Sequence, residues 1–265
     1  MHIFHPSILR EYDIRGTVDE TITAHDALAI GRSFGTVIVK KFGLNANCSV
    51  CYDGRESSPL LESALVDGLI STGVNVVRIG LGPSPMLYFS VHHLNLCAGV
   101  MVTGSHNPKN HNGFKLMLGK KSFFGQDLLN LSKIASDGSY EVGSGSIKNI
   151  SVLESYLEVL INAWGDFSSN INLVCWDPGN GAAGRITELL TQRLPGRHIL
   201  LNEKIDGTFP NHHPDPSVEE NLYQIRQSIK ENNADLGIAF DGDGDRIGVI
   251  DSKGRIIWPD QLLAI

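Results

Sequence analysis

Three carboxylates at alternating positions form a candidate metal site. They are Asp241, Asp243 and Asp245 in the segment DGDGDR, each separated from the next by a glycine. Glycine lets the backbone fold closely enough to bring the carboxylates toward one point, and a divalent cation offsets their mutual repulsion. A calcium EF-hand is excluded because Arg246 and Ser252 stand where that loop needs glycine and glutamate. A solvated acidic turn would give no reason for glycines between apolar strands, so we predict a divalent metal site.

A serine in the segment TGSHNP is the second candidate for chemistry. The segment follows an apolar run, and Gly104 allows a sharp turn that would project Ser105 outward with His106 beside it. Serine, asparagine and proline are also ordinary turn residues, and the Gly-x-Ser-x-Gly elbow of hydrolases is absent. Taken alone, the segment leaves a functional serine and a structural turn both open.

The segment GNGAAG, from Gly179 to Gly184, matches the pattern of dinucleotide-binding turns. It lies between a predicted strand and a predicted helix, and Glu203 stands at the end of the next predicted strand, where such sites place an acidic residue. Against this, the carboxylate of Asp177 would sit near a pyrophosphate. A dinucleotide site and a structural strand-to-helix turn are both retained as hypotheses.

Basic residues and histidines in loop-like segments complete the candidates. Arg15, Lys115 and Arg246 are each embedded in glycine-adjacent sequence, although each by itself is typical of a solvated surface charge. The segment NHHPDP carries His212 and His213, but adjacent histidines seldom converge on one metal. Its prolines favour a rigid loop, so we predict a role in shape or in substrate contact.

Alternating strands and helices must position these residues. A helix is predicted after the first strand, with Ser58 as its cap and Pro59 in its first turn. The alternation indicates an α/β fold with mixed, mainly parallel sheets. The strand segments SVCYDGR and LVCWDPG are similar, which suggests two tandem domains of similar α/β topology. The predicted strands span residues 48–52, 74–80, 97–104, 171–176, 198–202 and 234–240.

Composition excludes several classes of protein. The chain has 265 residues, 42% of them hydrophobic, and a net charge of −7, which argues against a general nucleic-acid or membrane-surface binder. Four cysteines are too few for a disulfide scaffold, and Cys48 and Cys51 would point to opposite faces of a strand. No secretory signal or membrane-length apolar run is present, which indicates a cytoplasmic protein. The sequence carries no signal for oligomeric state.

Four motifs occur together in one order: REYDIRG, TGSHNP followed by NGFK, GNGAAG, and DGDGDR. In this combination and at these spacings, the sequence resembles the α-D-phosphohexomutase superfamily over essentially its whole length. The segments FPNHHPDP and PDQLL are similar to those of the bacterial phosphomannomutase/phosphoglucomutase branch. The resemblance therefore implies both a fold and an activity.

The implied fold has four domains, of which the first three share an α/β topology. Here the resemblance implies domain 1 at residues 1–148 and domain 2 at residues 149–250, with the Gly- and Ser-rich stretch 138–150 as a linker or an exposed hairpin. Residues 251–265 would be the truncated start of domain 3. The family's sugar-selecting and substrate-phosphate loops would then lie beyond Ile265, so we expect a fragment with little or no turnover by itself.

The implied activity is that of an intramolecular phosphotransferase, a phosphohexomutase. It would interconvert the 1-phosphate and 6-phosphate of a hexose, mannose or glucose, through a phosphoserine at Ser105 and a 1,6-bisphosphate. The implied cofactor is Mg²⁺ and the implied partner is the phosphorylated hexose, with no nicotinamide or flavin. The implied metal ligands are Ser105, Asp241, Asp243 and Asp245. The implied catalytic groups around the reacting phosphate are Ser105, Arg15, His106, Lys115 and Arg246, with Lys115 or His106 in proton transfer.

Three other hypotheses stay open. A phosphotransferase of the D-x-D phosphatase type would use Asp241 as its nucleophile, although Asp245 replaces the Thr or Val usual in that motif. An oxidoreductase would bind a dinucleotide at GNGAAG. A non-catalytic phosphosugar-binding module would keep the metal and phosphate loops without turnover.

Overall fold

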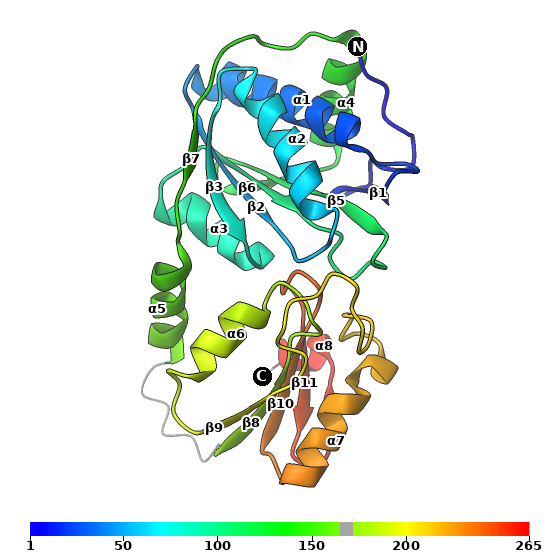
Figure 1. The fold of residues 1–265 in the computed structure, drawn as a ribbon, viewed down its shortest axis with the longest axis vertical. Coiled ribbons are helices and arrows are strands. Elements are labelled where there is room, and N and C mark those ends of the chain that lie inside the picture. The colour runs from blue at the N-terminus through cyan, green and yellow to red at the C-terminus, as the bar shows by residue number, and fades with distance from the viewer. Residues whose placement is uncertain (165–171, 265) are drawn as a thin grey trace. The chain divides into compact units, whose positions relative to one another are not determined.

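The computed structural model describes residues 1–164 and 172–264, which form two compact units, each with its own sheet (Figure 1). Unit 1 is Met1–Val152 and unit 2 is Leu153–Ile265. The predicted domain boundaries after residues 148 and 250 stay predictions. The predicted strand start at Ile171 lies outside the described residues.

Unit 1 is built on a seven-stranded mixed sheet in the order β1-β5-β4-β2-β3-β7, with β6 paired to β5. Its central strands β4, β2 and β3 are parallel, and β5 runs antiparallel to β4. The strands are β1 (Ile14–Thr17), β2 (Asn47–Tyr52), β3 (Asn75–Leu81), β4 (Ala98–Val102), β5 (His111–Leu118), β6 (Lys121–Phe123) and β7 (Ile147–Asn149). The helices are α1 (Ala24–Phe42), α2 (Ser58–Ile70), α3 (Ser84–His93) and α4 (Gln126–Asp137).

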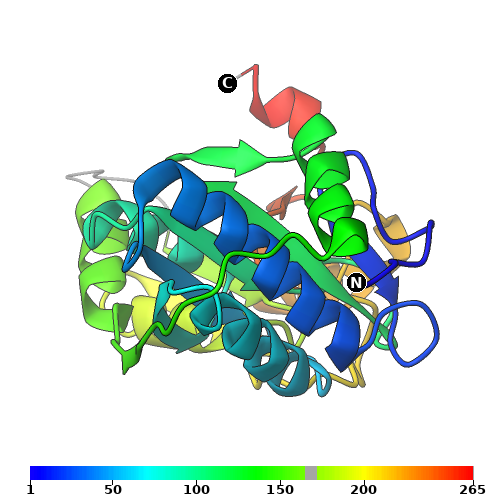
Figure 2. The same cartoon turned by 90° about the horizontal axis from the view of Figure 1, so that it is seen from above.

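Helices cover both faces of this sheet, α1 and α2 on one side and α3 on the other (Figures 1 and 2). Strand β2 is buried on both faces, as its apolar run predicts. Cys48 packs into the core under α1 and α2, and burial raises the pKa of its thiol. Ser49, on the opposite face, shares a hydrogen bond of 2.7 Å with Ser90 of α3. Cys51 also faces away from Cys48, with its thiol 3.7 Å from the carbonyl of Gly82.

Two local predictions for unit 1 are wrong. Ser58 does not cap α2 but is its first residue, because its hydroxyl donates to the buried carboxylate of Asp53 at 2.6 Å. The stretch 138–150 is neither a linker nor a hairpin. It runs along the edge of the sheet and ends as β7, where the amide of Val76 donates to the carbonyl of Ser146 at 2.8 Å. Gly145 permits this approach, since a side chain there would collide with the backbone of Val74.

Unit 2 is built on a five-stranded sheet in the order β12-β11-β10-β8-β9. Alternate residues of β8 pack into hydrophobic clusters on the two faces of this sheet. Leu173 and Cys175 pack beneath α7. Val174 and Trp176 pack with Leu194 on the other face. The strands are β8 (Leu173–Asp177), β9 (Arg197–Leu200), β10 (Leu236–Phe240), β11 (Ile247–Asp251) and β12 (Ile256–Ile257). The helices are α5 (Leu153–Trp164), α6 (Gly184–Thr191), the 3₁₀ turn η1 (Glu219–Leu222), α7 (Tyr223–Asn232) and α8 (Pro259–Leu262).

The two units repeat one topology, which confirms the predicted pair of similar α/β domains. The order β5-β4-β2-β3 in unit 1 corresponds to β11-β10-β8-β9 in unit 2, with the first pair antiparallel and the other two pairs parallel in both. The connections also match, because α2 and α3 occupy the places of α6 and α7 in the chain order. Within the described parts of the chain, no helix has both the length and the apolar character to cross a membrane.

Candidate functional site

In each unit the candidate functional residues lie on the turn between the same two strands of the repeated topology. In unit 1 the turn from β4 to β5 carries Ser105, and in unit 2 the turn from β10 to β11 carries the three aspartates. Both turns leave the carboxyl end of a parallel strand, the edge at which α/β sheets bind ligands. The repeat therefore assembles a serine loop in one unit and an acidic turn in the other.

Residues 103–111 form the serine loop, and Ser105 is held in it by unusual backbone geometry. Its φ of 51° is in the left-handed region, which non-glycine residues rarely adopt. The amide of Ser105 donates to the hydroxyl of Thr103 at 2.7 Å, and that hydroxyl donates to Asp53 at 2.8 Å. Ser105 is buried, and its hydroxyl oxygen lies 3.4 Å from Nδ1 of His106. Side-chain bonds thus hold the middle of the loop, whose two ends are held by backbone pairing.

Arg15 lies at this loop, as one of the predicted basic residues. Strand β1 pairs with β5 so that Arg15 lies opposite Gly113, and its guanidinium donates to Asn107 of the serine loop at 2.9 Å. Asp13 orients the same guanidinium at 2.7 Å. Lys115 is half-buried in β5, on the face of the sheet opposite that of Phe114.

Asp53 and Arg55, which no motif in the sequence singles out, hold the serine loop through hydrogen bonds. They follow β2 directly, in the segment YDGR, and both side chains are almost fully buried. Asp53 accepts hydrogen bonds from Thr103 and from the amide of Gly104, and Arg55 donates to four carbonyls of the loop. The available signal was a charged pair placed immediately after a buried parallel strand.

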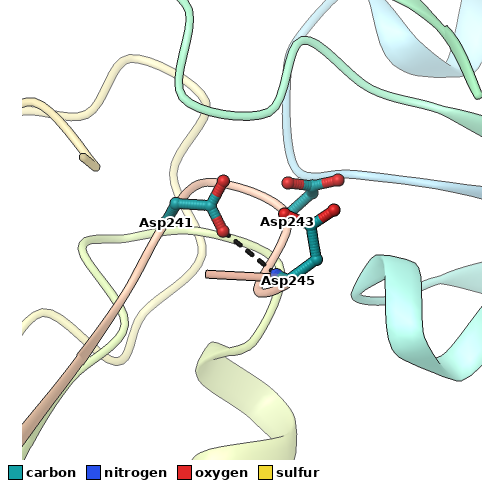
Figure 3. A group of neighbouring side chains, drawn as sticks. All are labelled: Asp241, Asp243 and Asp245. Atoms are coloured by element: carbon teal, nitrogen blue, oxygen red, sulfur yellow. Dashed lines mark hydrogen bonds between the residues drawn. The ribbon is translucent and has the colours of Figure 1, made fainter. Parts of the chain in front are cut away.

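The acidic turn of unit 2 brings its three carboxylates together. One oxygen from each of Asp241, Asp243 and Asp245 lies within 4.8 Å of the others. Figure 3 shows the three side chains on this turn. The turn is closed by Asp241, whose Oδ1 accepts the backbone amides of Asp245 and Arg246 at 3.0 Å each. Asp241 and Asp243 are buried, whereas Asp245 is exposed.

This donor set fits a hard divalent cation. Carboxylate oxygens are the ligands that Mg²⁺ prefers, and a partly exposed cluster leaves room for the waters that this ion retains. Two buried carboxylates beside a third are costly without a compensating positive charge. The three aspartates therefore form a candidate metal site, and the guanidinium of Arg246 follows directly in the chain.

The GNGAAG segment supports the acidic turn and has a structural role. Gly181 approaches that turn so closely that a side chain would lie 2.8 Å from the carbonyl of Gly242, and the next amide, of Ala182, donates to the same carbonyl at 2.9 Å. We call residues 179–184 the glycine turn. The carboxylate of Asp177 lies at the start of this turn and accepts a hydrogen bond from the amide of Gly179 at 2.9 Å. The carbonyl of Glu203 lies against Gly184, so this turn is filled by the protein's own groups.

His212 of the NHHPDP segment packs against the same carboxylate. Its Nε2 lies 2.9 Å from Asp177. Burial disfavours the charged imidazolium, but the hydrogen bond to Asp177 and that residue's negative charge outweigh it, so the pKa of His212 is raised. This contact joins the loop to the end of β8, and the role of the segment in shape or in substrate contact stays a prediction.

Comparison with known proteins places both units in one family. The model for the α/β/α domain I of phosphoglucomutase/phosphomannomutase matches residues 6–133, and the model for domain II matches residues 154–254. The chain belongs to the phosphoglucomutase/phosphomannomutase family. The predicted superfamily is thereby confirmed, together with its α/β domains.

Curated relatives include bacterial mutases of this family. The chain is 40% identical over 260 residues to a phosphomannomutase/phosphoglucomutase of Pseudomonas putida, covering 98% of this chain and 55% of that protein. It is 38% identical to a phosphoglucomutase of Neisseria meningitidis, covering 97% of this chain and 56% of that protein. The chain thus spans about half the length of the curated relatives it matches.

Solved structures of this family have the same fold. A phosphoglucomutase/phosphomannomutase family protein from Burkholderia thailandensis is 38% identical with a TM-score of 0.89, over 97% of this chain and 57% of that chain. A structure from Thermus thermophilus described as a phosphomannomutase, at 23% identity and a TM-score of 0.83, covers 97% of this chain and 60% of its own and shares the fold.

Proposed function

We propose that this chain is the phosphoryl-carrying and metal-binding part of a phosphohexomutase. The observation that carries the proposal is the placement of Ser105 and the triple-aspartate turn on equivalent connections of two repeated units that belong to this family. The names of the relatives specify mannose and glucose phosphates as the substrate class. The whole enzyme would interconvert the 1-phosphate and the 6-phosphate of such a hexose.

Ser105 would carry the phosphoryl group. A hydroxyl of the bound hexose phosphate loses its proton and attacks the phosphorus of phosphoserine. The bond from phosphorus to Oγ breaks, Oγ takes up a proton, and a 1,6-bisphosphate forms. The opposite phosphate then returns to Oγ, leaving the isomeric monophosphate. The distance of 3.4 Å between Oγ and Nδ1 of His106 supports His106 as a group that holds the serine proton, with Lys115 as the alternative.

Asp241, Asp243 and Asp245 would hold Mg²⁺, with an oxygen of phosphorylated Ser105 as a further ligand. When bound, the ion supplies positive charge to phosphoryl oxygens. Three carboxylates and one Mg²⁺ sum to about −1, and a phosphoserine adds roughly −1.5 to −2 at neutral pH.

An anionic sugar phosphate could approach such a site only if local cations offset this excess of negative charge. We assign that task to Arg15, Lys115 and Arg246. A loose phosphoryl-transfer transition state spreads its charge over the equatorial oxygens, so aligned cations stabilise it. In unit 1 the bond from Arg15 to Asn107 supports this assignment.

Incubation of the chain with glucose 1,6-bisphosphate, followed by intact-mass and fragment-ion spectrometry, tests the proposal. We expect one added phosphate, located on Ser105 and absent from Ser105→Ala. The matched control is Ser139→Ala, which removes an exposed serine of the same unit and should label like the original chain.

Other outcomes identify the alternatives. Label on Asp241 would support a phosphotransferase of the phosphatase type, and no label at all would contradict a phosphoserine carrier. Heat evolved on titration with NAD would support a dinucleotide-binding oxidoreductase. Label on Ser105 that a hexose 1-phosphate cannot discharge would support a binding module without turnover.

A further inference from the structure

We infer that Arg55 is a positioning residue for phosphoryl transfer, fixing the backbone of the serine loop so that Ser105 can accept and donate the phosphoryl group. The inference rests on the role proposed for Ser105. It concerns a residue far from the loop in sequence, at the end of β2, whose side chain has no exposed surface. Arg55 would act through the loop and not on the phosphate.

The guanidinium of Arg55 donates to four carbonyls of a single loop. Nη2 reaches the carbonyls of Ser105 and Asn107, both at 2.7 Å. Nη1 reaches the carbonyls of Pro108 and His111 at 2.6 and 3.0 Å. One side chain therefore binds carbonyls along most of the serine loop, in addition to the backbone bonds from the amides of Asn107 and His111 to the carbonyls of Gly104 and Pro108.

Asp53 completes this support at the start of the loop. It accepts Nε of Arg55 at 3.1 Å, the hydroxyl of Thr103 at 2.8 Å and the amide of Gly104 at 3.3 Å. The pair is buried, so neither charge would be stable alone. Asp53 holds the residues before Ser105, and Arg55 holds Ser105 and the residues after it.

All five N–H groups of the guanidinium are used by the protein itself. Nε serves Asp53, and the four N–H groups of Nη1 and Nη2 serve the four carbonyls. A phosphate on Ser105 would have to displace one of these bonds to reach Arg55. This is the reason to assign Arg55 to positioning and to distinguish it from the direct phosphate contacts proposed for Arg15.

The structure also requires arginine at this place. The planar fork presents its donors in two directions at fixed spacing, whereas a lysine ammonium presents three donors from one point. Gly104 leaves room for the guanidinium of Arg55, since a Cβ atom at this position would lie 2.5 Å from the guanidinium carbon. A lysine would keep the charge and leave loop carbonyls without donors.

The consequence for chemistry is the conformation of Ser105. A left-handed backbone is unfavourable for a non-glycine residue, so the loop would relax without external support. The bond from Arg55 to the carbonyl of Ser105, opposite the bond from its amide to Thr103, holds this conformation. A relaxed Ser105 would misdirect its hydroxyl, and misplacement by about 1 Å can cost about 100-fold in rate.

The second unit supports this assignment by contrast. Aligning SVCYDGR with LVCWDPG places Asp177 opposite Asp53 and Gly179 opposite Arg55. Unit 2 thus has a glycine where unit 1 has Arg55, and its acidic turn is closed by the carboxylate of Asp241. Arg55 is therefore specific to the unit that contains the serine loop and is not a general feature of the repeated fold.

Three variants test the inference: Arg55→Lys, Arg55→Ala and the control Arg78→Met. Arg78 forms an ion pair with the buried Glu62 at 2.8 Å elsewhere in unit 1, so its loss perturbs the same unit without touching the serine loop. We expect amide hydrogen exchange of residues 103–111 to rise in both Arg55 variants and to stay unchanged in Arg78→Met. Phosphate uptake from glucose 1,6-bisphosphate should slow by about 100-fold in Arg55→Lys.

Chemical rescue distinguishes positioning from general destabilisation. Methylguanidinium should restore uptake and loop protection in Arg55→Ala, because it can occupy the space of the missing fork, whereas methylammonium should not. A folded Arg55→Lys variant with the original exchange and uptake would overturn the inference. If the original chain takes no phosphate, the proposed function fails, and the exchange measurement still decides whether Arg55 holds the loop.

A measurement on the original chain covers the case in which the Arg55 variants do not fold. Nuclear magnetic resonance of arginine side chains should show slowly exchanging Nη protons for Arg55. Their frequencies should change little when Ser105 is phosphorylated, because they bond to backbone carbonyls. A large change on phosphorylation would indicate direct contact with the phosphate and would overturn the positioning role.

Discussion

At the ends of β2 and β8, two buried aspartates hold the loops that surround them. Asp53 binds the start of the serine loop, and Asp177 binds the glycine turn and His212. The carboxylate in each case replaces backbone hydrogen bonds that a tight turn cannot make for itself. Substitution of such residues should alter loop geometry before it alters the sheet.

The bond between His212 and Asp177 predicts a pH dependence of stability. The pKa of His212 is raised in the folded state, so its stabilising contribution is fully present below the unfolded value of about 6.5 and is lost as the pH rises through the folded value. We expect the difference in unfolding free energy between the original chain and His212→Asn to be largest in acid and to shrink as the pH rises. Urea denaturation followed by tryptophan fluorescence measures it in unit 2, which holds all three tryptophans of the chain.

His213→Asn is the control, because it removes a histidine from the same loop and keeps the contact with Asp177. A difference for His212→Asn that is constant or grows with pH would contradict this prediction.

At this scale, the sequence predicts residues whose type and spacing are local signals. Asp241, Asp243 and Asp245 form such a signal, and the structure brings their oxygens together. Arg55 could not be predicted in the same way, because its partners lie about fifty residues later and only the folded chain brings them close.

Among the elements, the predicted strands with continuous apolar runs were the most reliable. Strand β4 is buried along its whole length, as its sequence indicates. Strand β7 was missed, because its residues are exposed and it pairs only with the edge of β3. Edge strands depend on a neighbouring backbone more than on their own side chains, so hydrophobic periodicity does not detect them.

The contact between the glycine turn and the acidic turn gives a prediction at the level of elements. Gly181→Ala should destabilise unit 2 by about 1–3 kcal/mol, because the new methyl group meets the carbonyl of Gly242. It should also weaken Mg²⁺ binding, measured by isothermal calorimetry, although Gly181 offers no ligand atom. The shift would come from displacement of the turn between Asp241 and Asp243.

Gly237→Ala is the matched control for this experiment. Its methyl group would meet the side chains of Ile225 and Ile229 in the core of the same unit, so stability should fall while the affinity for Mg²⁺ is kept. Equal affinities in Gly181→Ala and the original chain would show that the glycine turn does not shape the metal site.

At the scale of the whole molecule, hydrogen exchange can test the proposed role of phosphorylated Ser105 as a ligand of Mg²⁺. Without phosphate on Ser105, Mg²⁺ should protect unit 2 alone from hydrogen exchange, and about 100 times its dissociation constant should add about 2.7 kcal/mol to the unfolding free energy of that unit. Once Ser105 is phosphorylated, the same ion should also protect residues 103–111 of unit 1. Mass spectrometry of exchanged peptides measures both effects.

Asp243→Asn is the variant that should lose both effects, whereas Glu231→Gln removes an exposed acidic charge of unit 2 and should keep them. Protection that stays confined to unit 2 after phosphorylation would contradict a shared ion.

The matched connections of the two units point to a common ancestor that was duplicated. After duplication, each copy could change one turn without disturbing the sheet, since the strand on either side kept its place. One copy now has a serine on this turn and the other has three aspartates, while an aspartate stands at the end of the corresponding strand, β2 or β8, in both. A single inherited scaffold would thereby supply both halves of the proposed phosphoryl transfer.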